Sequence, residues 1–150
     1  MKHYIIAALL LSLAACNSQP AVPVNTDDGS AASIQVAQNM FAAFNRHDWK
    51  AMAGYYSNPA SFLDPSYGKS FVTQSRDSVI AKYTGLQQML PDVKDSIISI
   101  FARGNKVSVE FISSGTLPDG QKFTLPISTV LTIKDSLIVS DATYYDNSGK

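Results

Sequence analysis

The stretch that decides the fold is FNRHDWKAMAGYYSNPASFLDP, residues 44–65. It closes one amphipathic helix, turns a tight corner, and opens a second helix at Asp48, whose side chain is a good N-cap. It then passes into a short strand that Pro65 interrupts. The helix before the corner has apolar residues at helical spacing: Ile34, Ala37, Phe41 and Phe44. The order helix, helix, strand therefore begins the domain.

The rest of the chain changes from helical to strand periodicity. RDSVIAKYTGLQQMLPD, residues 76–92, carries one apolar stripe and stops at a proline. Turn sequences RGN, LPDG and KDS then separate four β-rich runs, which predicts an antiparallel meander. These runs are DSIISIFA, KVSVEFISSGT, KFTLPISTVLTI and SLIVSDATYYD. The fold class is therefore α+β, with three N-terminal helices covering one face of a sheet.

The N-terminus MKHYIIAALLLSLAAC is typical of an export signal, with a lysine, a short apolar run and small residues before the one cysteine. LAAC, ending at Cys16, resembles the lipobox of bacterial lipoproteins, and the alternative is an ordinary signal with a stray thiol. We expect a signal at 1–15, a lipidated cysteine and flexible tether at 16–32, a domain at 33–147 and a tail at 148–150. The expected location is the bacterial cell envelope. Asn17, by resemblance to enteric lipoproteins, slightly favours the outer membrane.

Charge and composition exclude two classes of partner. Without Lys2 of the predicted signal, eleven basic residues face twelve acidic ones, and no basic patch is interleaved with aromatic residues. We therefore expect no nucleic-acid binding. The sequence contains no cluster of Cys and His at the spacing of metal ligands, so we expect no metal and no cofactor.

The order of these motifs resembles SnoaL-like domains of the nuclear transport factor 2-like superfamily. The resemblance rests on the corner at 44–65, on LPDVKDSI after the third helix, on SSGT in the central hairpin and on DSLIVSDATYYD as the last strand. It covers about 33–147. It implies a cone, in which a curved antiparallel sheet wraps round the helices and leaves a pocket at its open end. The superfamily includes isomerases, cyclases, dehydratases and binding proteins, so the fold does not define the activity.

The resemblance also implies that Asp146, at the end of the last strand, belongs to the pocket, with Tyr144 two residues earlier on the same strand face. A carboxylate in an apolar pocket can exchange protons near neutral pH, and a tyrosine hydroxyl can stabilise an enolate. A strand-end aspartate bonded to nearby backbone is the alternative. Strand alternation puts Asp141 and Asp146 on opposite faces unless a bulge intervenes, and it does not decide which face lines the pocket. The resemblance favours Asp146 and places Asp141 where a histidine is often found, which favours binding over catalysis.

Other residues are candidates for lining the pocket. We expect a ligand to contact Tyr56, Phe62, Asp64, Tyr83 and Asp146. Asp64, beside Tyr67, also suits a turn before proline. We expect His47 at the surface of the corner and Glu110 on an outer or interface face.

Three functions follow. The first is a lipid-anchored protein, held at the membrane through Cys16, that binds a small apolar or amphipathic molecule in its pocket. The second is an isomerase, cyclase or dehydratase that uses Asp146 as acid and base. The third is an envelope interaction module that forms a homodimer through its sheet face.

Overall fold

A computed structural model describes residues 28–148 as three helices and one six-stranded sheet. The predicted signal, Cys16 and most of the predicted tether lie outside the described residues. The elements, in chain order, are α1 (Ser30–Asn45), α2 (Trp49–Gly54), β1 (Tyr56–Leu63), β2 (Val72–Gln74), α3 (Arg76–Met89), β3 (Lys94–Arg103), β4 (Lys106–Thr116), β5 (Lys122–Lys134) and β6 (Leu137–Tyr144). Among residues 28–148, no helix is both long and apolar enough to cross a membrane.

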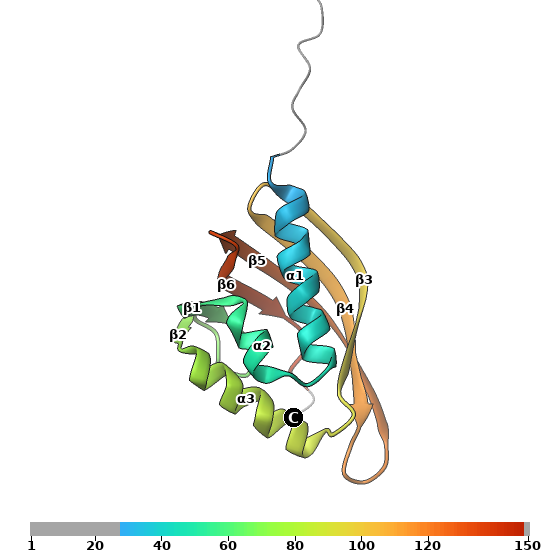
Figure 1. Cartoon of the computed structure of the whole chain (residues 1–150). Helices are drawn as coiled ribbons and strands as arrows, with labels where there is room; N and C mark the ends of the chain where they lie inside the picture. The colour runs from blue at the N-terminus through green and yellow to red at the C-terminus, as the bar shows by residue number, and fades with distance from the viewer. Residues whose placement is uncertain (1–27, 149–150) are drawn as a thin grey trace, which may run out of the picture.

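The sheet has the strand order β2-β1-β6-β5-β4-β3. The predicted meander is present, since β3, β4, β5 and β6 pair as antiparallel neighbours. One pair differs from the prediction of an antiparallel sheet, because β1 lies parallel to β6. The sheet curls round the helices (Figure 1), and the prediction of an α+β fold with a curved sheet is confirmed.

The corner between α1 and α2 forms as the sequence indicates. Asp48 caps α2 by accepting a hydrogen bond of 3.0 Å from the backbone N–H of Ala51. The expectation for His47 is wrong, because its ring is partly buried and contacts three elements. It bonds to the carbonyl of Val93 at 2.8 Å and to the amide of Gln87 at 3.1 Å, and it stacks on Trp49. His47 therefore ties the corner to α3 and to the start of β3.

Helix α1 begins at Ser30, inside the segment predicted as tether. The Asp28 carboxylate accepts hydrogen bonds from the backbone N–H groups of Ser30 and Gly104, both at 3.0 Å. These bonds fasten the first turn of α1 to the turn between β3 and β4. The last residues of the predicted tether, from Asp28 on, therefore belong to the folded domain.

A bulge in β6 determines which of its side chains face the helices. Thr132 pairs with Ser140, but the next residue, Ile133, pairs with Ile138. Val139 is therefore an extra residue on β6, and the inward face changes from even to odd numbers beyond it. Ile138 is buried before the bulge and Asp141 is buried after it. On β4, Glu110 is exposed, as expected from the sequence.

Candidate functional site

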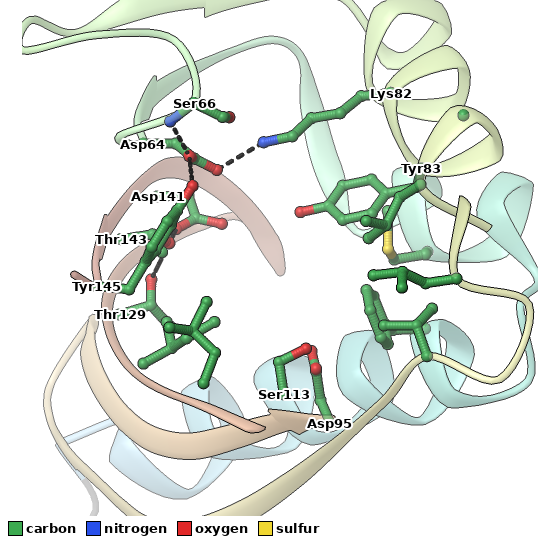
Figure 2. Close-up of a pocket in the computed structure, with 18 of the residues that line it drawn as sticks. Asp64, Ser66, Lys82, Tyr83, Asp95, Ser113, Thr129, Asp141, Thr143 and Tyr145 are labelled. Atoms are coloured by element: carbon green, nitrogen blue, oxygen red, sulfur yellow. Dashed lines mark hydrogen bonds and ion pairs between the residues drawn. The ribbon is translucent and has the colours of Figure 1, made fainter. Parts of the chain in front are cut away.

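A cavity of about 910 Å³ lies between the helices and the inner face of the sheet. Its wall is mainly apolar and aromatic, and Figure 2 shows the polar side chains that project into it from opposite sides. The apolar lining includes Met40, Phe41, Phe44, Met52, Phe62, Leu86, Phe111, Leu125 and Ile127. The aromatic side chains line the cavity but do not fill it.

Both oxygens of the Asp141 carboxylate accept hydrogen bonds from side chains of the cavity wall. Its Oδ2 accepts a hydrogen bond of 2.8 Å from the hydroxyl of Tyr56. Its Oδ1 accepts hydrogen bonds from the hydroxyls of Thr129 and Thr143, at 2.7 and 2.8 Å. Burial raises the pKa of Tyr56 well above its usual value, and the neighbouring carboxylate raises it further. This hydroxyl therefore stays protonated and keeps donating to Asp141.

Asp95 is the cavity's unsatisfied carboxyl group. It lies on β3, opposite Ser113 of β4, and is only 8 % exposed. Its Oδ1 is buried without a hydrogen-bond partner. Burial raises the pKa of the carboxyl to about 7, although the Ser113 hydroxyl acts in the opposite direction. At neutral pH this group can either hold or release a proton.

A second polar cluster is built round Asp64, at the end of β1. Its carboxylate forms an ion pair of 2.6 Å with Lys82 of α3 and accepts a hydrogen bond of 2.9 Å from the hydroxyl of Tyr145. It also accepts the backbone N–H of Ser66 at 2.7 Å, which is the turn-forming role expected before a proline. Burial opposes ionisation of Asp64, but Lys82 and Ser66 together hold its pKa below the usual value.

Stacked aromatic rings connect one wall of the cavity, on α3, to helix α2. Tyr83 of α3 stacks on Trp49 with ring centroids 5.7 Å apart, and burial raises the pKa of Tyr83 well above its usual value. The indole N–H of Trp49 donates to the side-chain oxygen of Gln87 at 2.7 Å. Lys82 lies over the ring of Tyr67 at 4.3 Å. This wall is held by packing and by polar contacts at its edges.

The structure brings four predicted residues together and separates two from them. Tyr56, Phe62, Asp64 and Tyr83 all line the cavity. Asp146 and Tyr144 do not line it. Asp146 is exposed, and hydrogen bonds from the hydroxyl and then the backbone N–H of Ser148 lower its pKa. Tyr144 is 53 % exposed.

The expected placement of Asp146 and Tyr144 is therefore corrected. The bulge at Val139 turns Asp141, Thr143 and Tyr145 inward instead. Asp146 is instead a strand-end aspartate that is bonded to nearby backbone, which is the alternative given above.

Sequence reasoning missed Asp95 and Lys82. A signal for Asp95 exists in VKDSI, where alternation places it on the same strand face as Val93 and opposite Lys94 and Ser96. An acid on an otherwise apolar face indicates a functional or strained position. The sequence around Lys82 on α3 contains no comparable signal, because the role of this lysine depends on its ion pair with Asp64, which is distant in the sequence.

Metal binding finds no support in the part of the chain that the structure describes. Within residues 28–148, no three His, Cys, Asp or Glu side chains are grouped so that they could hold a metal ion.

Comparison with known proteins agrees with this architecture. Residues 37–141 match the SnoaL-like domain model, so the chain belongs to the SnoaL-like domain family. No protein with a curated description matches the sequence.

Solved structures share the fold at low sequence identity. A hypothetical protein of Catenulispora acidiphila with a ketosteroid isomerase-like fold, in complex with trimethylamine, has a TM-score of 0.68 and 20 % identity over 76 % of this chain and 87 % of its own. IdmH, a putative polyketide cyclase from Streptomyces antibioticus, has a TM-score of 0.68 and 20 % identity over 77 % and 92 %. An LEH-like epoxide hydrolase of M. tuberculosis has a TM-score of 0.66 and 14 % identity over 79 % and 85 %. At these identities the likeness establishes the fold alone.

Proposed function

We propose that this SnoaL-like domain binds a small, largely apolar organic molecule in the cavity between its helices and sheet. The observation that carries the proposal is the size and lining of that cavity. A volume of about 910 Å³ falls within the range of ligand pockets, which is roughly 300–1,000 Å³. Its apolar lining with a few convergent polar groups is the usual composition of such pockets.

A fluorescent probe tests this proposal. N-phenyl-1-naphthylamine is apolar, and its emission rises when it leaves water. We expect the protein to bind it with saturation at one site per chain. Energy transfer from Trp49, the one tryptophan in the sequence, gives an independent signal because this residue stacks on Tyr83 of the cavity wall.

Gly85 offers a variant that fills the cavity without disturbing the fold. It lies in α3, lines the cavity, and a Cβ added there would meet no atom within 4 Å. Gly85→Leu also removes a poor helix former. We expect it to weaken probe binding at least tenfold. Thr84→Leu, on the exposed side of the same helix, is the matched control and should bind as the wild type does. Equal binding by all three proteins would contradict the proposed site.

Membrane attachment through Cys16 belongs to the same proposal. The support comes from the sequence alone, in which LAAC follows an apolar run. Cys16 itself lies outside the described residues. Cys16→Ser should release the protein into the soluble fraction of the host cell. Continued retention in the membrane fraction would overturn lipid anchoring and leave the cavity proposal untouched.

Enzymatic proton transfer is the second candidate, with Asp95 as the group that exchanges the proton. It is favoured by one observation, a buried carboxyl with a pKa of about 7 in the wall of a ligand-sized cavity. The names of two structural neighbours, a putative polyketide cyclase and an LEH-like epoxide hydrolase, also support this candidate. Turnover of a carbonyl substrate that Asp95→Asn abolishes, with binding retained, would establish this candidate.

Self-association through the outer sheet face stays a prediction. Phe101, Ser108 and Val130 occupy one row across β3, β4 and β5, and both apolar side chains of the row are exposed. Sedimentation velocity of the wild type and of Phe101→Lys would test it. A monomeric wild type would contradict it.

A further inference from the structure

The cavity contains more acid than base, and this imbalance points to the chemistry of its ligand. Three carboxyl groups and one lysine line it, and Lys82 is already paired with Asp64. The two remaining carboxyls, Asp95 and Asp141, have no cationic partner among the described residues. The two carboxyls differ in their hydrogen bonds within the protein, and this difference indicates which of them would bind a ligand.

Asp141 is satisfied by the protein itself. Three hydroxyl groups donate to its two oxygens, from Tyr56, Thr129 and Thr143. Asp95 has only the Ser113 hydroxyl beside it, and its Oδ1 has no partner. A buried carboxyl oxygen without a partner costs free energy that a bound donor would recover. Figure 2 shows the Asp95 carboxyl projecting beside Ser113 from the sheet into the cavity.

We propose that the ligand is an apolar amine, whose protonated nitrogen pairs with Asp95 while its apolar body occupies the aromatic cavity. This inference rests on the proposed binding function and names its ligand class. An ammonium group supplies both the donor that Oδ1 lacks and the positive charge that the cavity lacks. The aromatic lining suits the same group, because a desolvated cation is attracted to ring faces. Phe111 lies two residues before Ser113 on the buried face of β4, and its ring packs against Phe41 at 4.8 Å.

The position of Asp95 is fixed before any ligand arrives. The side chain of Asn45, the last residue of α1, donates to the backbone carbonyl of Asp95 and accepts its backbone N–H, both at 2.8 Å. A preorganised carboxylate loses little freedom on binding, which favours affinity. The carboxyl is thus held against the cavity by two neighbouring elements, α1 and β4.

A pair of nearly isosteric probes tests the amine. 2-Naphthylmethylamine is a cation at pH 8, whereas 2-naphthylmethanol is neutral and has the same apolar body. We expect the wild type to bind the amine at least tenfold more tightly than the alcohol. Asp95→Asn should remove this preference by weakening the affinity for the amine at least tenfold relative to that for the alcohol. Asp146→Asn removes an exposed carboxylate outside the cavity and should leave the preference intact.

Proton release gives a readout that a merely structural role would not produce. At pH 6 the Asp95 carboxyl is largely protonated, so pairing with an ammonium should pass its proton to the buffer. Calorimetry in buffers of different ionisation enthalpy should detect the release of up to one proton in the wild type and none in Asp95→Asn. The other titratable side chains that line the cavity are Tyr56, Asp64, Tyr67, Lys82, Tyr83, Asp141 and Tyr145. Asp141→Asn is therefore measured in parallel.

The outcomes separate the two proposals. A preference that survives in Asp95→Asn, or that disappears in Asp141→Asn alone, overturns the assignment to Asp95. Equal binding of amine and alcohol by the wild type overturns the amine but leaves the apolar binding site. Failure of both probes and of N-phenyl-1-naphthylamine to bind overturns the binding function itself. If Asp95→Asn does not fold, the wild-type calorimetry decides, and the absence of proton release contradicts the proposal.

Discussion

Asn45 holds the backbone of Asp95 by two hydrogen bonds of 2.8 Å, which join residues 50 positions apart in the sequence. Because β3 is an edge strand of the sheet, these bonds satisfy backbone groups that no neighbouring strand pairs. The last residue of α1 thereby closes the edge of the sheet at the point where the cavity carries its unpaired carboxyl.

Replacing Asn45 with Ala should destabilise the fold. The change leaves one N–H and one C=O of Asp95 unpaired in a partly buried place, at a cost of about 1–3 kcal/mol. Urea unfolding measures it. Asn39→Ala is the matched control, since Asn39 makes only an exposed hydrogen bond with Gln35 of the same helix. A cost below about 0.5 kcal/mol for Asn45→Ala would contradict the structural role of this contact.

Asp95 should make the protein less stable as the pH rises, whereas carboxyl groups with a lowered pKa make a protein more stable. Burial raises the pKa of Asp95 to about 7 in the folded protein, against 3.8 for an ordinary aspartate. The folded state therefore binds the proton more tightly, and the resulting stability is present below pH 4 and lost as the pH rises through 7. One pKa unit corresponds to about 1.4 kcal/mol, and the two pKa values differ by about three. Relative to Asp95→Asn, the wild type should therefore lose roughly 4 kcal/mol of unfolding free energy between pH 4 and pH 8.5.

Chemical unfolding of both proteins across that range measures this difference. Asp146→Asn is the control, because its lowered pKa acts only below pH 4. A stability gap between wild type and Asp95→Asn that does not change with pH would mean that Asp95 is not desolvated in the folded protein.

The hydroxyl of Tyr56 should contribute to the stability of the fold, whereas the hydroxyl of Tyr55 should not. Tyr56→Phe removes the donor to Asp141 Oδ2 in a buried place and should cost about 1–3 kcal/mol. Tyr55→Phe removes a hydroxyl from a partly buried tyrosine that only packs against the core, so it should change stability by less than about 0.5 kcal/mol. Thermal unfolding of the two variants compares them directly, and equal effects would contradict the contact.

The ion pair between Lys82 and Asp64 should also be measurable, since both side chains are largely buried. Lys82→Gln leaves the carboxylate without its cation, and we expect a loss of about 1–3 kcal/mol at pH 7. The loss should shrink as Asp64 is protonated below pH 4. Lys50→Gln, at an exposed position of α2, serves as control in the same urea titrations. A loss that is unchanged at low pH would assign the effect to packing of the lysine stem.

The fold could be predicted from local signals, and the site only in part. Helix spacing before Asp48, its capping side chain and the turn sequences of the second half are short-range features, and each formed as expected. The orientation of the last strand depends on an extra residue, Val139, that the alternating pattern does not reveal. That single insertion exchanges Asp146 for Asp141 in the cavity. The pairing of Lys82 with Asp64 depends on the tertiary packing of α3 against β1, so no local pattern predicts it.

A crystal structure of the protein grown with N-phenyl-1-naphthylamine tests the central claim most directly. We expect electron density for one probe molecule inside the cavity, in contact with Phe41, Tyr83 and Phe111. Crystals of Gly85→Leu grown in the same way should lack it. Density for the probe only on the outer surface, or a cavity closed by its own side chains, would contradict the assignment of this cavity as a ligand-binding site.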